Sequence, residues 1–232
     1  ETNYNFLDLG WNVRLLSDNQ IKEAVQQARS SDLAILVVGE NSMRYHWNEK
    51  TCGENSDRYE LSLPGRQQEL VEAVAATGVP TVVILVNGRP LTTEWIDENM
   101  PCIIEAWEPG VAGGQALAEI LYGKVNPSGK LPITIPRSTG QIQCMYNHKF
   151  TNHWFPYATG NSLPLYEFGY GLSYTTYKYE NLKLSEATTT PDKSVKVIVD
   201  VTNTGKMDGE ETVQLYIRDE YSSATRPVKE LK

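Results

Sequence analysis

The chain of 232 residues lacks the features of several large protein classes. No apolar run approaches the roughly 18 residues that a membrane-spanning helix needs. The first residues form neither the basic nor the apolar region of a secretion signal, so we predict no signal peptide in this sequence. No cluster of lysine and arginine occurs, and the net charge is −8. Both properties argue against a nucleic-acid-binding protein.

Motifs of several enzyme classes are absent as well. The cysteines Cys52, Cys102 and Cys144 are widely spaced and form no CxxC or Cys/His metal pattern, which leaves their pairing open. The glycines of residues 110–114 match neither the Walker nor the dinucleotide pattern, which disfavours a nucleotide-binding protein. No GxSxG nucleophile elbow occurs. The sequence therefore predicts no metal site and no cofactor.

Apolar residues at helical spacing alternate with continuous apolar runs up to residue 137. Asp18 is placed to cap the first helix, Pro64 to lie in the first turn of the second, and Gly78 to end it. The predicted helices are 18–30, 63–77, 93–98 and 113–121. The runs 33–38 and 81–86 are typical of strands buried on both faces, and further strands are predicted at 102–105 and 131–135. This order predicts an α/β fold, a three-layer sandwich with a mostly parallel sheet and helices on both faces.

The composition changes after residue 137. Residues 138–176 are rich in glycine, proline, asparagine and aromatic residues and lack helical periodicity, so we predict an irregular linker. The segments 177–185, 194–201 and 212–217 alternate between apolar and polar residues, as antiparallel strands do. They predict the start of an antiparallel β-sandwich that is cut off near residue 232. The predicted domains are residues 1–137, 138–176 and 177–232.

Glu54 is the first candidate for chemistry. It follows Gly53 in a loop between a predicted strand and a predicted helix, and parallel sheets bind ligands beyond the carboxyl ends of their strands. A carboxyl group held there can act as a general acid and base. The alternative is an ordinary exposed glutamate, which from spacing alone is the commoner case.

Other charged residues near this loop have weaker claims. Glu40 is the second candidate because it directly follows Gly39, at the carboxyl end of a predicted strand. Glu49, in the same loop, is a third. Asp57 and Arg58 are predicted to form a structural ion pair near the next helix, because arginine does not donate a proton at ordinary pH.

An aromatic patch, Tyr45, His46 and Trp47, precedes Glu54 in the same loop. Aromatic faces stack on the C–H faces of sugars, so we predict substrate contact, with core packing as the alternative. His46 has no second histidine at metal-ligand spacing. An acidic chain with 13 tyrosines and 5 tryptophans suits a neutral sugar ligand, although acidic surfaces also serve solubility.

Seven motifs, in this order, resemble glycoside hydrolase family 3. The members of that family are β-glucosidases, β-xylosidases and related exo-acting enzymes. The similarity extends over nearly the whole chain but covers only the C-terminal half of the family's architecture. The motifs are Leu36–Glu40, Cys52–Arg58, Leu61–Gln67, Val86–Pro90, Glu105–Gly110, Gly123–Pro132 and Phe168–Tyr174.

The resemblance implies a division of labour between domains. In this family a TIM-like barrel at the N-terminus carries an aspartate nucleophile, and the α/β sandwich supplies the acid/base glutamate. A fibronectin-III-like domain follows the last of the seven motifs. The segment Thr51–Asn55 is similar to bacterial members in which the glutamate is the proposed acid/base, which carries over to Glu54. In other members the glutamate directly after the strand has this role, which corresponds to Glu40.

We therefore expect the C-terminal portion of a retaining, exo-acting β-glycosidase, with β-glucosidase ahead of β-xylosidase. The expected substrates are β-linked glycans or aryl glucosides, and the expected location is periplasmic or secreted in a bacterium. Because a retaining glycosidase needs two carboxylates about 5–5.5 Å apart, and this chain offers only one good candidate, the isolated chain is expected to be inactive. The alternative is a non-catalytic carbohydrate-binding or scaffolding fragment. A homodimer is left open.

Overall fold

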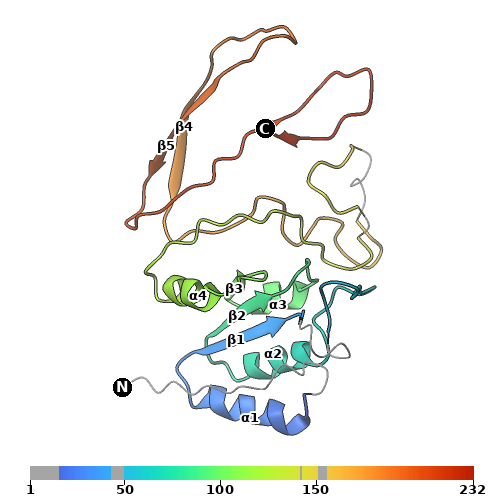
Figure 1. Ribbon diagram of the computed structural model, residues 1–232, viewed down its shortest axis with the longest axis vertical. Coiled ribbons are helices and arrows are strands. Elements are labelled where there is room, and N and C mark those ends of the chain that lie inside the picture. The colour runs from blue at the N-terminus through green and yellow to red at the C-terminus, as the bar shows by residue number, and fades with distance from the viewer. Residues whose placement is uncertain (1–15, 43–49, 142, 151–155) are drawn as a thin grey trace.

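The computed structural model describes residues 16–42, 50–141, 143–150 and 156–232 (Figure 1). Up to residue 121 helices and strands alternate, whereas the described residues after it contain strands but no helix. None of the described helices is both long and apolar enough to cross a membrane. The elements are α1 Asp18–Arg29, β1 Ala34–Gly39, α2 Gln67–Ala75, β2 Thr81–Val86, α3 Glu94–Asn99, β3 Cys102–Glu105, α4 Gly113–Leu121, β4 Tyr177–Leu184, β5 Val197–Asn203, β6 Tyr216–Ile217 and β7 Glu230–Leu231.

The first three strands form a parallel sheet in the order β1-β2-β3. Pairing runs from Ala34 opposite Thr81 to Gly39 opposite Val86, so β1 and β2 end together. Strand β3 pairs with β2 up to Glu105, which lies opposite Leu85. The predicted parallel sheet is thus confirmed, and its three carboxyl ends form one edge.

Three helices pack on the same face of this sheet. Figure 1 shows α1 and α2 together on one side of the strands, where they share a buried cluster with Ala34. A second cluster joins α2 and α3 to the side chains of Val38, Val83 and Leu85, which point to that same face. Each fully buried Val, Leu or Ile contributes about 1.5–3 kcal/mol to folding. These clusters hold the end of β1 firmly against α2.

The opposite face of β1 is not buried. Ile35 is 47% exposed and Val37 is 63% exposed, so the prediction of a strand buried on both faces is wrong for β1 in this structure. The physical reason is its position at the edge of the sheet, since Ile84 on the central strand is only 2% exposed. An exposed apolar patch of this kind is typical of a contact surface. Helices on both faces of the sheet therefore remain a proposal.

The capping residue of α1 and the start of α2 differ from the prediction. Ser17, not Asp18, caps α1: its hydroxyl accepts the Gln20 N–H at 3.3 Å, while the Gln20 side chain accepts the Ser17 N–H at 2.9 Å. Helix α2 begins at Gln67 because Gly65, with a φ of 61°, interrupts the helical path after Pro64. Helix α3 begins one residue later than predicted, and α4 has the predicted bounds.

The segment 131–135 is not a regular strand. Ile135 makes an isolated antiparallel bridge to Tyr166, and the Leu131 N–H donates to the Tyr170 carbonyl at 2.8 Å. Between these two points the pairing is interrupted. The prediction of a strand is wrong because its partner, the glycine-containing segment 165–170, has no regular strand of its own.

The last part of the chain contains two small antiparallel sheets. Strands β4 and β5 pair from Tyr177 opposite Asn203 to Leu184 opposite Val197, with an irregularity near Asn181, whose φ is 55°. Strands β6 and β7 form the other pair. Figure 1 shows β4 and β5 extending away from the parallel sheet. The predicted strand at 212–217 is reduced to Tyr216–Ile217.

Candidate active site

The carboxyl ends of the three parallel strands bring distant residues together. Backbone hydrogen bonds continue the sheet one step beyond the strands, from Glu40 N–H to the Val86 carbonyl at 2.8 Å and from Asn87 N–H to the Trp107 carbonyl at 3.2 Å. Glu40, Asn87 and Trp107 therefore lie side by side at one edge. This is the place where parallel sheets bind ligands.

The end of β1 is held by two close contacts. Gly39 has a φ of 141°, and a Cβ at this position would overlap the carbonyl oxygen of Val86. The buried side chain of Gln67 binds both backbone groups of Gly39, accepting its N–H at 2.6 Å and donating to its carbonyl at 2.7 Å. Only glycine fits this position, and the first residue of α2 fixes the direction in which the chain leaves the sheet.

The loop that follows β1 closes at its base. The Asn41 carbonyl accepts the N–H groups of Thr51 at 2.8 Å and of Cys52 at 3.2 Å, and the Asn41 N–H donates to the Thr51 hydroxyl at 2.7 Å. The chain therefore returns to the sheet edge before it enters the segment that contains Glu54. Glu49 and the aromatic patch of Tyr45, His46 and Trp47 lie outside the described residues.

Glu54 lies at the tip of a tight turn. The turn spans residues 53–56 and is closed by the Ser56 N–H, which donates to the Gly53 carbonyl at 3.1 Å. Gly53 and Asn55 both have positive φ values, 86° and 58°, which glycine and asparagine adopt at least cost. The side chain of Glu54 is exposed, so its carboxyl group is accessible to another molecule or domain. The Lys50 ammonium donates to the Glu54 backbone carbonyl.

Glu40 has the opposite environment. Its side chain is fully buried, and its Oε1 lies 3.2 Å from Arg58 Nη1 and 3.3 Å from Arg89 Nε. Arg58 also donates to the Ser62 carbonyl at 2.7 Å. The predicted Asp57–Arg58 pair is thus wrong: Asp57 is exposed, and Arg58 neutralises the buried carboxylate, which would be costly to leave unpaired.

Glu105 is a third carboxylate at this edge, and the sequence analysis did not single it out. It accepts the Trp107 N–H at 3.1 Å, and Trp107 has a positive φ of 52°. Burial raises the pKa of Glu105 to about 7, although hydrogen bonds from Trp107 and Asn87 act in the other direction. The sequence signal that could have identified Glu105 is its position directly after the apolar residues 102–104. Its protonation near neutral pH depends on burial, which the sequence does not state.

Cys52 directly precedes the turn of Glu54 and is buried. Its Sγ is 3.9 Å from the Glu108 carboxylate. Burial raises the pKa of the thiol to about 11, and the nearby carboxylates of Glu40 and Glu108 add to the effect. The thiol therefore stays protonated at neutral pH and is a poor nucleophile. All three cysteines are free, which settles the question of their pairing in this structure.

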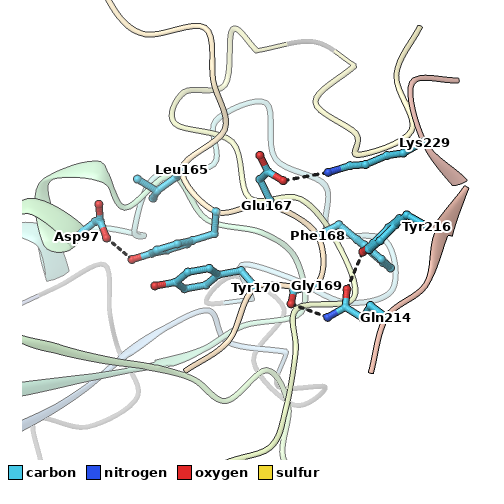
Figure 2. Close-up of a pocket in the computed structure, with 10 residues that line it drawn as sticks. Asp97, Leu165, Glu167, Phe168, Gly169, Tyr170, Gln214, Tyr216 and Lys229 are labelled. Carbon is cyan, nitrogen blue, oxygen red and sulfur yellow. Dashed lines mark hydrogen bonds and ion pairs between the residues drawn. The ribbon is translucent and has the colours of Figure 1, made fainter. Parts of the chain in front are cut away.

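A separate cavity of about 550 Å³ lies between α3, residues 165–170 and the last strands (Figure 2). Neither Glu40 nor Glu54 lines it. Its polar side chains largely bind one another across the junction, which suits a contact between chain segments better than a ligand site. The pairs are Asp97 with Tyr166 at 2.5 Å, Glu167 with Lys229 at 3.2 Å, and Gln214 with the Gly169 carbonyl at 2.9 Å.

Residues 5–174 match the model of the glycosyl hydrolase family 3 C-terminal domain. Among curated proteins, a β-xylosidase of Formosa agariphila is 42% identical over 96% of this chain and 30% of its own length. A periplasmic β-glucosidase of Salmonella typhimurium is 43% identical over 91% of this chain and 28% of its own length.

A solved structure agrees with these relatives. The crystal structure of a β-glucosidase from Listeria innocua in complex with glucose superposes with a TM-score of 0.86 at 32% identity, covering 95% of this chain and 31% of that one. The chain thus spans less than a third of the length of these proteins. The ordered motifs, the family match and the similar fold agree, and the chain belongs to glycoside hydrolase family 3.

Proposed function

We propose that this chain supplies the acid/base glutamate of a retaining, exo-acting β-glycosidase, and that Glu54 is this residue. The observation that carries the proposal is the contrast between two carboxylates at one sheet edge. Glu54 is exposed at the tip of a turn, whereas Glu40 is fully buried between two arginines. An acid/base group must reach the glycosidic oxygen, so the exposed carboxylate has the better geometry.

The proposed mechanism is double displacement. An aspartate on an N-terminal TIM-like barrel attacks the anomeric carbon and forms a glycosyl-enzyme, while Glu54 protonates the departing oxygen. Glu54 then removes a proton from the water that hydrolyses this intermediate. The lengths of the relatives, more than three times that of this chain, leave room for such a barrel.

The proposed substrates are β-linked glucosides or xylosides, including aryl glucosides. The names of the two curated relatives support these sugars, and the Listeria protein was crystallised with glucose. We assign Tyr45, His46 and Trp47 to substrate contact because of their position in the loop before Glu54. A periplasmic or secreted location is proposed from the Salmonella relative.

The proposed domain organisation accompanies this function. Residues 1–137 would form the family's α/β sandwich, with helices on both faces of the sheet, and residues 138–176 a linker. Residues 177–232 would belong to a fibronectin-III-like domain. The two small antiparallel sheets support this last assignment.

The test uses the full-length protein. We expect Glu54→Gln to reduce hydrolysis of aryl glycosides with poor leaving groups about 10²–10⁴-fold, and that of activated dinitrophenyl glycosides far less, because only poor leaving groups need a proton. Azide should rescue Glu54→Gly and yield a β-glycosyl azide. Rescue of Glu40→Gly instead would overturn the assignment. A full-length protein that binds sugar but hydrolyses no glycoside would favour the non-catalytic alternative.

A further inference from the structure

The turn that presents Glu54 has little rigidity of its own. One backbone hydrogen bond closes it, and its residues Gly53, Glu54 and Asn55 are all exposed. Exposed turns with few buried contacts open readily. A displacement of about 1 Å in a catalytic group can cost about 10²-fold in rate. An acid/base residue on such a turn therefore needs support from outside the turn.

Lys50 gives the first such contact. The residue is only 5% exposed, and its ammonium donates to the backbone carbonyl of Glu54. The Lys50 Cε would lie 3.3 Å from a Cβ at Gly53, so the aliphatic stem packs directly under the turn. Lysine is rarely buried, because an ammonium loses its hydration there unless it is hydrogen-bonded. The burial of this charge against the Glu54 turn points to a specific role.

Arg89 gives the second contact, from another segment. Its Nη2 donates to the Ser56 carbonyl at 2.8 Å, and its Nε lies 3.3 Å from the buried carboxylate of Glu40. The Asn87 side chain donates to the Arg89 carbonyl at 2.9 Å, which fixes the backbone of Arg89 just beyond β2. Arg89 thus ties the far side of the turn to the ends of β1 and β2.

We propose that Lys50 and Arg89 are positioning residues for the acid/base group: the two cations bind the backbone carbonyls of Glu54 and Ser56 and hold the Glu54 carboxylate at the catalytic position. This inference rests on the proposed role of Glu54. Under this proposal the buried Glu40 is also a positioning residue, because its carboxylate binds and orients Arg89. The residues act through Glu54 and do not touch the reacting atoms.

The experiment compares leaving groups in the full-length protein. For Lys50→Met and Arg89→Met, kcat/KM is measured with phenyl and with dinitrophenyl glycosides of the sugar that the wild-type protein hydrolyses. We expect activity on the phenyl glycoside to fall at least about tenfold further than activity on the dinitrophenyl glycoside, because a displaced acid affects only the leaving group that needs protonation. The change should appear in kcat rather than KM.

Two matched controls come from the same chain. Lys130 is a half-buried lysine whose ammonium donates to the Gly171 carbonyl at 2.6 Å. Arg137, like Arg89, binds both a carboxylate, that of Glu94, and a backbone carbonyl, that of Leu163. Lys130→Met and Arg137→Met remove the same kinds of bond away from the Glu54 turn. We expect them to leave the ratio between the two substrates unchanged.

The outcomes separate this inference from the proposed function. If Glu54→Gln changes the leaving-group ratio but Lys50→Met and Arg89→Met change it no more than the controls, the positioning role is overturned and the role of Glu54 stands. If Glu54→Gln leaves the ratio unchanged, both proposals fail. Where a methionine variant does not fold, Lys50→Arg and Arg89→Lys replace it. They keep the charge but shift the donor, so an intermediate ratio supports positioning and a wild-type ratio contradicts it.

Discussion

At the residue scale, three carboxylates at one sheet edge have three different environments. Glu54 is exposed, Glu40 is fully buried between two arginines, and Glu105 is largely buried and accepts a backbone N–H. Residue type does not distinguish them. Environment assigns their chemistry, because burial favours the neutral form and a nearby cation favours the charged one.

Glu105 makes a prediction about pH. Its pKa is about 7 in the folded chain against an ordinary value of 4.5, so the folded state binds this proton more tightly than the unfolded state. The stabilising contribution is therefore fully present below about pH 4.5 and is lost as pH rises to about 7. We expect wild type to lose roughly 3 kcal/mol relative to Glu105→Gln over this window, as measured by urea unfolding at several pH values. An equal difference at pH 5 and pH 8 would contradict this assignment.

Gly39 makes a prediction about packing. Gly39→Ala places a Cβ against the Val86 carbonyl oxygen, which belongs to the neighbouring strand and cannot move away, so we expect a loss of about 3 kcal/mol or more. Gly78→Ala is the matched control, because Gly78 also has a positive φ, 77°, but no atom lies within 4 Å of its Cβ position. It should lose about 1 kcal/mol. Equal losses in thermal unfolding would mean that backbone conformation, not the clash, sets the cost.

At the element scale, helix boundaries follow hydrogen-bonding partners more than composition. Asp18 and Ser17 are both good capping residues, and the structure uses Ser17, paired reciprocally with Gln20. Asp18 instead lies 2.8 Å from Arg66, at the start of the next helix. Ser17 therefore caps the helix, while the side chain of Asp18 is engaged in the ion pair with Arg66.

Ser17→Ala tests this assignment. We expect it to lower the free energy of unfolding by about 1 kcal/mol, because the Gln20 N–H loses its acceptor. Ser17→Asp keeps an acceptor and should retain most of the stability. Asp18→Ala breaks only a surface ion pair and should cost less than Ser17→Ala. The reverse order in chemical denaturation would show that Asp18 caps the helix.

At the scale of the whole molecule, the chain exposes surfaces that suit further contacts. The outer face of β1 exposes Ile35 and Val37, and the tip of the Glu54 turn is exposed as well. Both features agree with a chain that spans less than a third of its relatives' length. In the proposed enzyme, catalysis needs a second carboxylate facing Glu54 at about 5–5.5 Å.

The isolated chain is therefore expected to be inactive. We predict that residues 1–232 hydrolyse neither nitrophenyl β-glucoside nor nitrophenyl β-xyloside faster than their own Glu54→Gln variant, whereas the full-length protein hydrolyses at least one of them. Turnover by the isolated chain that disappears in Glu54→Gln would show that the nucleophile lies within this sequence.

Local patterns in the sequence determined much of the fold. The strands 81–86 and 102–105 and the helix 113–121 were predicted with the observed bounds, because apolar runs and helical spacing act over a few residues. The predicted strand at 131–135 failed since its regularity depended on a distant partner. The ordered motifs around Glu40 and Glu54 were enough to indicate the family, which the comparisons confirm.

Only the tertiary structure decided how the carboxylates differ. Glu40, Arg58 and Arg89 come from three separate segments, and the register of the parallel sheet brings them together. No local sequence pattern predicts that these three side chains lie together, and none predicts the burial that raises the pKa of Glu105. The sequence by itself determined the family, the order of the elements and the candidates at the sheet edge. The structure decided which candidate is buried and which is presented, because burial and charge pairing depend on residues far apart in the chain.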